Sequence, residues 1–266
     1  MSFLALATIT AGVLAVSFLG LWVVSLAKRD VSIVDLYWGP AFGLVAWLGF
    51  ALGGASGHRP GLVAVLVTIW GLRLGLHLYF RNRGQPEDHR YGAMRANHGA
   101  RFGRVSLYTV FLLQAGLVLL ISTPLQLLSA AGADPELGPL DALAAGMVLL
   151  GIVFETVADA QLTRFRRDPR SRGRVLDTGL WRYSRHPNYF GDAVVWWGLG
   201  LFGVASDAWP SVFGPALMTF LLLKVSGVSL LEQTIQERRP EYAAYIARTA
   251  AFFPWKPRHP AGALVQ

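Results

Sequence analysis

The densest group of polar and aromatic side chains lies in residues 177–192, with the sequence DTGLWRYSRHPNYFGD. Two arginines, a histidine, an asparagine and two tyrosines stand between two glycines, and Pro187 predicts a helix start because proline suits the first helical turn. Asn188, Asp192 and Trp196 then recur every four residues and share one helix face. Arginines and the backbone amides of a helix start can bind phosphate. The segment predicts a site for a phosphorylated small molecule, with juxtamembrane packing as the simpler alternative.

Basic side chains interrupt the apolar run of residues 61–80. Arg73, His77 and Arg81 are spaced by four residues and share a helix face. Arg81 lies near the helix end, where its side chain can reach water. Arg73 and His77 lie deeper, and ionisable residues at that depth normally face a cavity and a partner, which favours a functional role over a bond between helices.

Two acids lie near the end of the apolar run of residues 140–158. Glu155 and Asp159 are four residues apart, and Arg166 follows at a spacing of seven, so the three can face one groove. Acids within a membrane span are costly unless they are satisfied. Ribose hydroxyls would satisfy them, and an acid–arginine brace between helices is the alternative.

Two more segments hold residues of catalytic type. Asp35 precedes Tyr37 and Trp38 at the start of an apolar run, where it could cap a helix or act as an acid toward a substrate. The two aromatic residues could equally form an interfacial belt. Residues 82–91 combine a Gly/Pro turn with both charge signs and Tyr91, so this loop could close through internal ion pairs or cover a polar ligand.

The C-terminal part adds Glu232 at the end of the last apolar run, then Tyr242 and Tyr245 three residues apart. Residues 252–255, with the sequence FFPW, are typical of an interfacial anchor. A solvated amphipathic tail is the alternative interpretation.

These residues must be positioned by membrane helices, since 53% of the chain is apolar and the mean hydropathy is +0.43. A spanning helix needs about 20 residues. We therefore predict an all-α polytopic protein with seven spans, of which the sixth is short and glycine-rich. The spans are Phe3–Ala27, Tyr37–Ala55, Gly61–Phe80, Ser106–Ala131, Leu140–Ala158, Asp192–Ala205 and Val212–Leu231.

Positive charge orients these spans. Of the 24 arginines and lysines, 21 fall in alternate connecting segments and the tail, which predicts an N-terminus outside and a C-terminus in the cytoplasm. The arginines flank apolar spans and form no single basic face, so the net charge of +8 does not indicate nucleic-acid binding. Membrane lipids and a phosphorylated small molecule are the expected partners.

The sequence predicts one domain over residues 1–266, with loops 81–105 and 159–191 and tail 232–266 forming the cytoplasmic side. The chain has no cysteine, which excludes disulfides, thiol nucleophiles and thiolate metal sites. It has no His-Glu-x-x-His pair, Gly-x-Ser-x-Gly elbow, Walker loop or Gly-x-Gly-x-x-Gly after a strand, so metal ligation of that type and the soluble nucleotide folds are not expected.

The segment Leu180–Asp192 resembles membrane steroid 5-alpha-reductases and sterol reductases, in which a Tyr-Ser stretch leads to Asn-x-x-Gly-acid. Residues 82–86, NRGQP, resemble the Asn-Arg-Gly-Arg-Pro turn after the third helix of those reductases. The resemblance spans roughly residues 30–255 and indicates a bacterial member of the family in the inner membrane. It implies seven helices, NADPH held from the cytoplasmic side and a lipid-like substrate that enters between helices.

By position, the resemblance assigns Arg73, Arg166, Arg174, Asn188 and Asp192 to NADPH, with Asp159 toward its polar groups and Trp196 alongside. Further polar side chains of the same segments complete the predicted cofactor set: His77, Tyr183, Arg185, His186, Tyr189, Glu232, Tyr242 and Tyr245.

Asp35 corresponds to the acid that, with a tyrosine, polarises the 3-keto group of the steroid in that family. The family has Gln-Glu where this chain has Val34-Asp35, and Trp70 stands where its tyrosine is expected, so Tyr37 or Tyr91 would supply the phenol. The implied reaction is NADPH-dependent reduction of the 4,5 double bond of a 3-oxo-4-ene steroid or similar enone by a monomeric enzyme.

Two alternatives remain open. The Arg-His-Pro-x-Tyr-x-Gly pattern of residues 185–191 also resembles membrane methyltransferases that use S-adenosylmethionine on isoprenylcysteine or phospholipids. Those enzymes usually carry a Glu-Glu pair where this chain has Glu232-Gln233. A lipid-binding or transport protein is the non-enzymatic alternative, although the chain lacks the paired, interrupted helices of many transporters.

Overall fold

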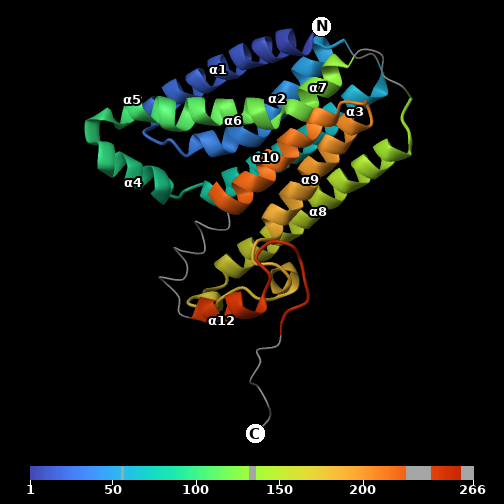
Figure 1. Cartoon of the computed structure of the whole chain (residues 1–266). Helices are drawn as coiled ribbons and strands as arrows, with labels where there is room; N and C mark the ends of the chain where they lie inside the picture. Colours follow the sequence, from blue (N-terminus) through green and yellow to red (C-terminus); the bar gives the residue numbers. More distant parts are fainter. Residues whose placement is uncertain (55–56, 132–135, 226–240, 259–266) are drawn as a thin grey trace. The chain divides into compact units, whose positions relative to one another are not determined.

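The computed structural model describes residues 1–54, 57–131, 136–225 and 241–258, and in these ranges the regular structure is helical, with no strand (Figure 1). The all-helical prediction is confirmed for this part of the chain. The chain divides into two compact units, one of Met1–Ala142 and Leu199–Gly214, the other of Leu143–Gly198 and Pro215–Gln266. The single domain proposed from the sequence stays a prediction.

Five helical stretches of the described residues are long and apolar enough to cross a membrane: α1 (Phe3–Lys28), α2 (Ile33–Leu52), α3 (His58–Asn82), the stretch His89–Ile121, and α8 (Pro139–Arg167). They agree with a multi-pass membrane protein. The predicted short sixth span is the continuous helix α9 (Pro187–Val204), which begins at the proline. The predicted seventh span contains α10 (Phe213–Phe220) and runs beyond the described residues after Val225. Seven spans and the membrane orientation stay predictions.

The fourth predicted span, Ser106–Ala131, differs from the structure. The helical stretch begins earlier and consists of α4 (His89–His98), a 3-10 turn, α5 (Phe102–Ser106), a π turn over residues 107–112, and α6 (Leu113–Ile121). It breaks at Ser122, and α7 (Thr123–Ala130) begins there with Pro124 in its first turn. The predicted loop 81–105 therefore contains α4.

In the first unit, α2 packs most extensively against α3 because glycines let the two backbones touch. A Cβ atom on Gly39 would lie 2.6 Å from the carbonyl oxygen of Gly71, so this crossing has no room for a side chain. Arg59, at the start of α3, is buried and donates two hydrogen bonds to Asp141 of α8, from Nε at 2.6 Å and from Nη2 at 2.9 Å. This ion pair fixes the start of α3.

In the second unit, α8 and α9 are a close pair for the same reason. A Cβ atom on Gly151 would lie 2.7 Å from the carbonyl oxygen of Gly191, and one on Gly198 would lie 2.9 Å from that of Ala144. This contact brings the polar ends of both helices together. The short helix α12 (Glu241–Arg248) packs through Tyr245 on the segment before α9, where the phenol donates to the carbonyl oxygen of Trp181.

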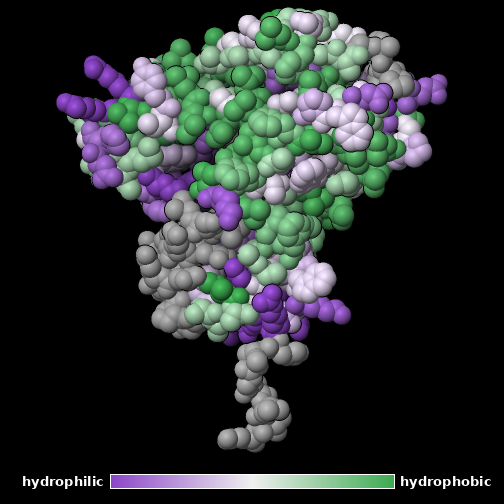
Figure 2. Space-filling model, viewed as in Figure 1, coloured by the Kyte–Doolittle hydropathy of each residue, from purple (hydrophilic) through white to green (hydrophobic). Residues whose placement is uncertain are grey.

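Apolar side chains cover much of the helical surface (Figure 2). Leu4, Val16 and Leu150 are among the large apolar side chains that stay more than half exposed. Lipid tails would cover such side chains in a bilayer, which explains why the helices need no further protein layer over them.

Candidate functional site

Asp35 lies in the first turn of α2 and joins two side chains from α4. Its Oδ1 accepts a hydrogen bond from the Tyr91 hydroxyl at 2.8 Å, and its Oδ2 accepts one from Arg90 Nη2 at 2.9 Å. The N-cap position belongs to Ser32, so Asp35 does not cap the helix. Tyr91 is 6% exposed, which leaves little water to compete for its hydroxyl. Of the two phenols expected from the sequence, Tyr91 is the one hydrogen-bonded to Asp35.

The turn before α4 brings Tyr91 to this position. Gly84 adopts a φ of 75°, which suits glycine, and the chain then reaches Asp88, whose carboxylate caps α4 by accepting from the backbone amide of Arg90 at 2.9 Å. The amide of Asp88 donates to the Ser32 hydroxyl at 2.8 Å. The start of α4 is thereby fixed to the start of α2.

Glu87 adds a second connection. Its carboxylate accepts two hydrogen bonds from Arg95, at 2.8 Å and 2.7 Å, and one from the amide of Val31 at 2.8 Å. The hydrogen bonds from Arg95 hold the pKa of Glu87 below its ordinary value. Burial opposes ionisation of Asp88, but hydrogen bonds from Arg90 outweigh it and lower the pKa of that carboxyl as well. The loop therefore closes through internal ion pairs, one of the two alternatives that its sequence left open.

Tyr37 and Trp38 have different surroundings. The Tyr37 ring packs against Phe18 of α1, with centroids 5.3 Å apart. The Trp38 ring packs on Phe42, which in turn contacts the buried Trp70 of α3. Trp38 Nε1 is buried and has no hydrogen-bond acceptor among the described residues. Trp38 and Phe42 of α2 and Trp70 of α3 thus form an aromatic row, in which the Trp38 indole donates to none of the described residues.

Arg73 and His77 are half-buried on α3, while Arg81 is exposed near the helix end, as expected for a side chain that reaches water. Arg73 and His77 both belong to the first unit, as do Asp35 and Tyr91. Their assignment to a cofactor stays a prediction.

A polar pair in the second unit joins α8 to α9. Asn188 lies in the first turn of α9, and its Nδ2 donates to Asp159 Oδ1 at 3.2 Å. The Oδ1 atom of Asn188 is buried and has no hydrogen-bond partner in the described part of the chain. Asp192 and Trp196, on the same face of α9, are buried at 7% and 0% exposure. The three residues therefore share one face of α9, on which Asp192 and Trp196 are buried and Asn188 is half-buried.

Other predicted residues of this unit surround the pair. Glu155 is buried one turn before Asp159, and the rings of His186 and Tyr189 stack with centroids 5.5 Å apart. Arg166, Arg174 and Tyr183 are exposed.

Arg185 and Tyr245 bind backbone oxygens. The Arg185 guanidinium donates to the carbonyls of Ile246 and Thr249 at the end of α12, and the Tyr245 hydroxyl donates to that of Trp181. Burial raises the pKa of the Tyr245 phenol. These contacts join α12 to the segment before α9.

Tyr242 and Glu232 complete the set of residues that the sequence assigned to the cofactor. The ring of Tyr242 lies edge-on to that of Tyr245, with centroids 5.5 Å apart. Glu232 lies outside the described residues.

Sequence reasoning did not identify Arg90 as a partner of Asp35, nor Arg95 as the partner of Glu87. An available signal was Asp88, since aspartate is typical of the N-cap position that it takes at the start of α4. The pairing of Asp35 with Tyr91 was harder to predict from the sequence, because the two residues are 56 positions apart.

The sequence model of one protein family, described as a protein of unknown function (DUF1295), matches residues 21–249. The uncharacterized protein C594.04c of Schizosaccharomyces pombe (strain 972 / ATCC 24843) is 28% identical over 260 residues, covering 88% of this chain and 75% of the yeast protein. No solved structure matches. The family match includes both the Asp35–Tyr91 pair and the Asp159–Asn188 pair.

Proposed function

This chain belongs to the DUF1295 family, part of the steroid 5-alpha-reductase-like superfamily, and from this premise we propose that it is an NADPH-dependent membrane reductase. Its substrate would be a 3-oxo-4-ene steroid or a similar lipid-like enone, and its location a bacterial inner membrane. The observation that supports this most directly is the hydrogen bond of 2.8 Å between Tyr91 and Asp35, which holds a buried phenol in a fixed orientation.

Reduction of an enone moves negative charge to the carbonyl oxygen. A hydride adds to the β carbon, the electron pair of the double bond shifts to give an enolate, and a proton at the α carbon completes the saturated ketone. A donor aimed at the developing oxyanion lowers the barrier. Tyr91 can be that donor when its proton turns from Asp35 to the carbonyl oxygen. Asp35 then keeps its ion pair with Arg90, which limits the cost of the lost hydrogen bond.

The second unit has residues that fit a nucleotide cofactor. Buried carbonyl oxygens almost always accept a hydrogen bond, and Asn188 Oδ1 accepts none from the described residues. A carboxamide or a hydroxyl of a ligand would supply the missing donor. Asp159, Asn188, Asp192 and Trp196 would hold the cofactor, which supplies a hydride when bound.

The test uses the purified full chain in lipid nanodiscs with NADPH and a 3-oxo-4-ene steroid. Oxidation of NADPH together with formation of the 4,5-reduced ketone would support the proposal. A Tyr91→Phe variant should lose turnover, whereas Tyr108→Phe is the matched control because Tyr108 is exposed on the π turn. A Tyr37→Phe variant separates the two phenols that the sequence proposed.

Methyl transfer is the second candidate, favoured by the stacked His186 and Tyr189 rings within the Arg-His-Pro-x-Tyr-x-Gly segment at the start of α9. The same preparation is therefore incubated with labelled S-adenosylmethionine and acceptor lipids. Methyl transfer without NADPH oxidation would exclude the reductase proposal.

A further inference from the structure

After α12, the described residues of the tail follow a path that hydrogen bonds define. Residues 249–258 fold back on the segment before α9 and on the end of α12. Four hydrogen bonds fix this path: Arg185 N to Ala250 O (2.9 Å), Ser184 Oγ to Phe252 O (2.8 Å), Trp255 N to Tyr183 O (2.9 Å) and Arg258 N to Arg248 O (2.8 Å).

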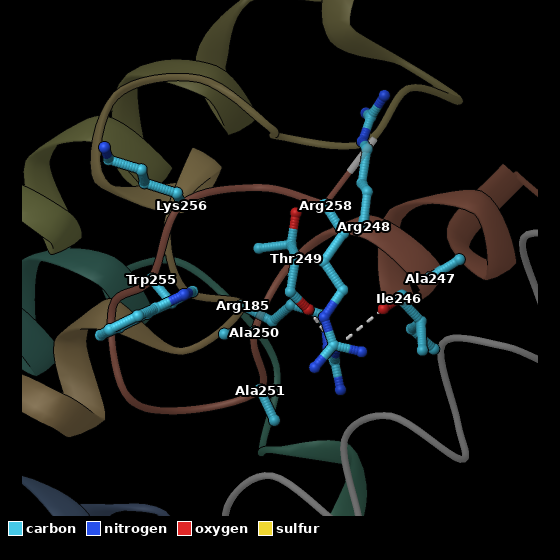
Figure 3. A pocket seen from close by; sticks show the side chains of 10 residues that line it. All are labelled: Arg185, Ile246, Ala247, Arg248, Thr249, Ala250, Ala251, Trp255, Lys256 and Arg258. Carbon is cyan, nitrogen blue, oxygen red and sulfur yellow. Dashed lines mark hydrogen bonds between the residues drawn. The ribbon is translucent and has the colours of Figure 1, made fainter. Parts of the chain in front are cut away.

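The tail, the end of α12 and Arg185 line a basic cavity of about 220 Å³, whose lining residues Figure 3 labels. Its lining holds the four basic side chains Arg185, Arg248, Lys256 and Arg258, and no acidic side chain among the described residues. Two of the four have further partners: Arg185 donates to carbonyl oxygens of α12 and Thr249, and Arg248 pairs with Asp177. Even with that one acid counted, positive charge exceeds negative charge among the described residues around the cavity, so an anion is the complementary ligand.

The size of the cavity limits the anion. Pockets for drug-sized ligands occupy about 300–1,000 Å³, so 220 Å³ is too small for a whole dinucleotide. A phosphate group with its ester is small enough. Arginine and lysine bind phosphate through charge-assisted hydrogen bonds, which matches the lining.

The surface beside the cavity indicates where the phosphate comes from. Phe253 and Trp255 are 67% and 73% exposed, although the neighbouring Phe252 is 5% exposed. Exposed aromatic rings next to basic side chains are typical of a membrane–water interface, where rings lie at headgroup depth and lysines and arginines meet anionic lipids.

We infer that residues 249–258 dock on an anionic phospholipid, with the headgroup phosphate in the cavity beside Lys256 and Arg258 and with Phe253 and Trp255 in the interface. Lys256 and Arg258, which carry the inference, belong to no predicted catalytic or cofactor contact, whereas Arg185 of the same lining is also in the predicted cofactor set. This lipid binding does not depend on whether the chain reduces an enone.

Lipid retention by the full chain tests the inference. The protein is purified in detergent, and binding of phosphatidylglycerol and phosphatidylcholine is measured by native mass spectrometry. Each basic residue near an anionic surface contributes roughly fivefold to affinity, so Lys256→Gln with Arg258→Gln should weaken phosphatidylglycerol binding about thirtyfold. Binding of phosphatidylcholine, which has no net charge, should weaken much less.

The control is Arg83→Gln with Arg101→Gln, which removes the same charge from exposed residues outside the cavity and should have little effect. Trp255→Ala provides a second variant that keeps the charge and should weaken binding of both lipids. Thermal unfolding in detergent verifies that each variant is folded. Equal phosphatidylglycerol binding by the cavity double variant and the control would overturn the inference. Saturable binding of inorganic phosphate, undiminished by phosphatidylglycerol, would also overturn it and assign the cavity to a soluble anion.

Discussion

Replacing Tyr91 by phenylalanine tests the proposed chemistry most sharply, because it removes one oxygen atom from a defined hydrogen bond. The phenol is 6% exposed and donates to Asp35 at 2.8 Å. If the same hydroxyl stabilises an oxyanion, its loss should lower kcat by about 100- to 1,000-fold, the usual cost of removing one such donor. The KM for NADPH should stay within about twofold, since Tyr91 belongs to no predicted cofactor contact.

The fold should tolerate this change. A hydrogen bond to a charged group contributes about 1.5–3 kcal/mol, and proteins unfold with free energies of about 5–15 kcal/mol. Asp35 also keeps Arg90 at 2.9 Å, so the loss should lie at the low end of that range. Unfolding in detergent, followed by circular dichroism, checks this expectation separately from activity.

The assay compares NADPH oxidation and product formation for the wild type, Tyr91→Phe and Tyr108→Phe at saturating enone. A Tyr91→Phe enzyme that keeps more than about a third of the wild-type kcat would refute the reasoning, because the loss of one oxyanion donor typically lowers kcat by at least about 100-fold. If Tyr37→Phe loses activity instead, the phenol assignment moves to Tyr37.

Three further predictions follow from the described contacts. Arg59→Met should lower the free energy of unfolding by about 3–5 kcal/mol, because it leaves Asp141 buried without its partner, and adding Asp141→Leu should recover much of that loss in equilibrium denaturation. Asn188→Ala should raise the Kd for NADPH, measured by fluorescence titration, while the melting temperature changes little; an unchanged Kd would count against Asn188 as a cofactor ligand. Because the pKa of Glu87 is lowered on folding, its pairing with Arg95 should stabilise the protein above the unfolded value near 4.5 and lose this effect as the pH falls through the lower folded value. Glu87→Gln should remove that part of the pH dependence from thermal unfolding curves, and an unchanged curve would contradict it.

The sequence predicted well those features that depend on local pattern. Pro187 begins α9 as expected, and Asn188, Asp192 and Trp196 share one helix face because a spacing of four residues nearly equals one helical turn. The apolar runs also located the long helices α1, α2, α3 and α8, because an apolar run of about 20 residues is typical of a helix that can cross a membrane. The start of α2 at Ile33 placed Asp35 inside the helix, which the apolar run alone did not indicate.

Features that depend on distant contacts were harder to predict. Helix α4 has a polar composition, and its stability comes from the Asp88 cap and from ion pairs rather than from an apolar stripe. Residue type also cannot distinguish an arginine that binds phosphate from one that binds backbone carbonyls. Arg185 does the latter in the described residues, and its assignment to a cofactor stays a prediction.

The glycine contact between α2 and α3 bears on how the chain is assembled in the membrane. Lipid offers no hydrophobic gain for joining two helices, so Gly39 and Gly71 supply the close van der Waals contact that associates them. Synthesis from the N-terminus completes this hairpin before Tyr91 emerges. Biogenesis should therefore pass through a stage in which Asp35 has been made without Arg90 and Tyr91, and other groups or water must solvate its carboxylate.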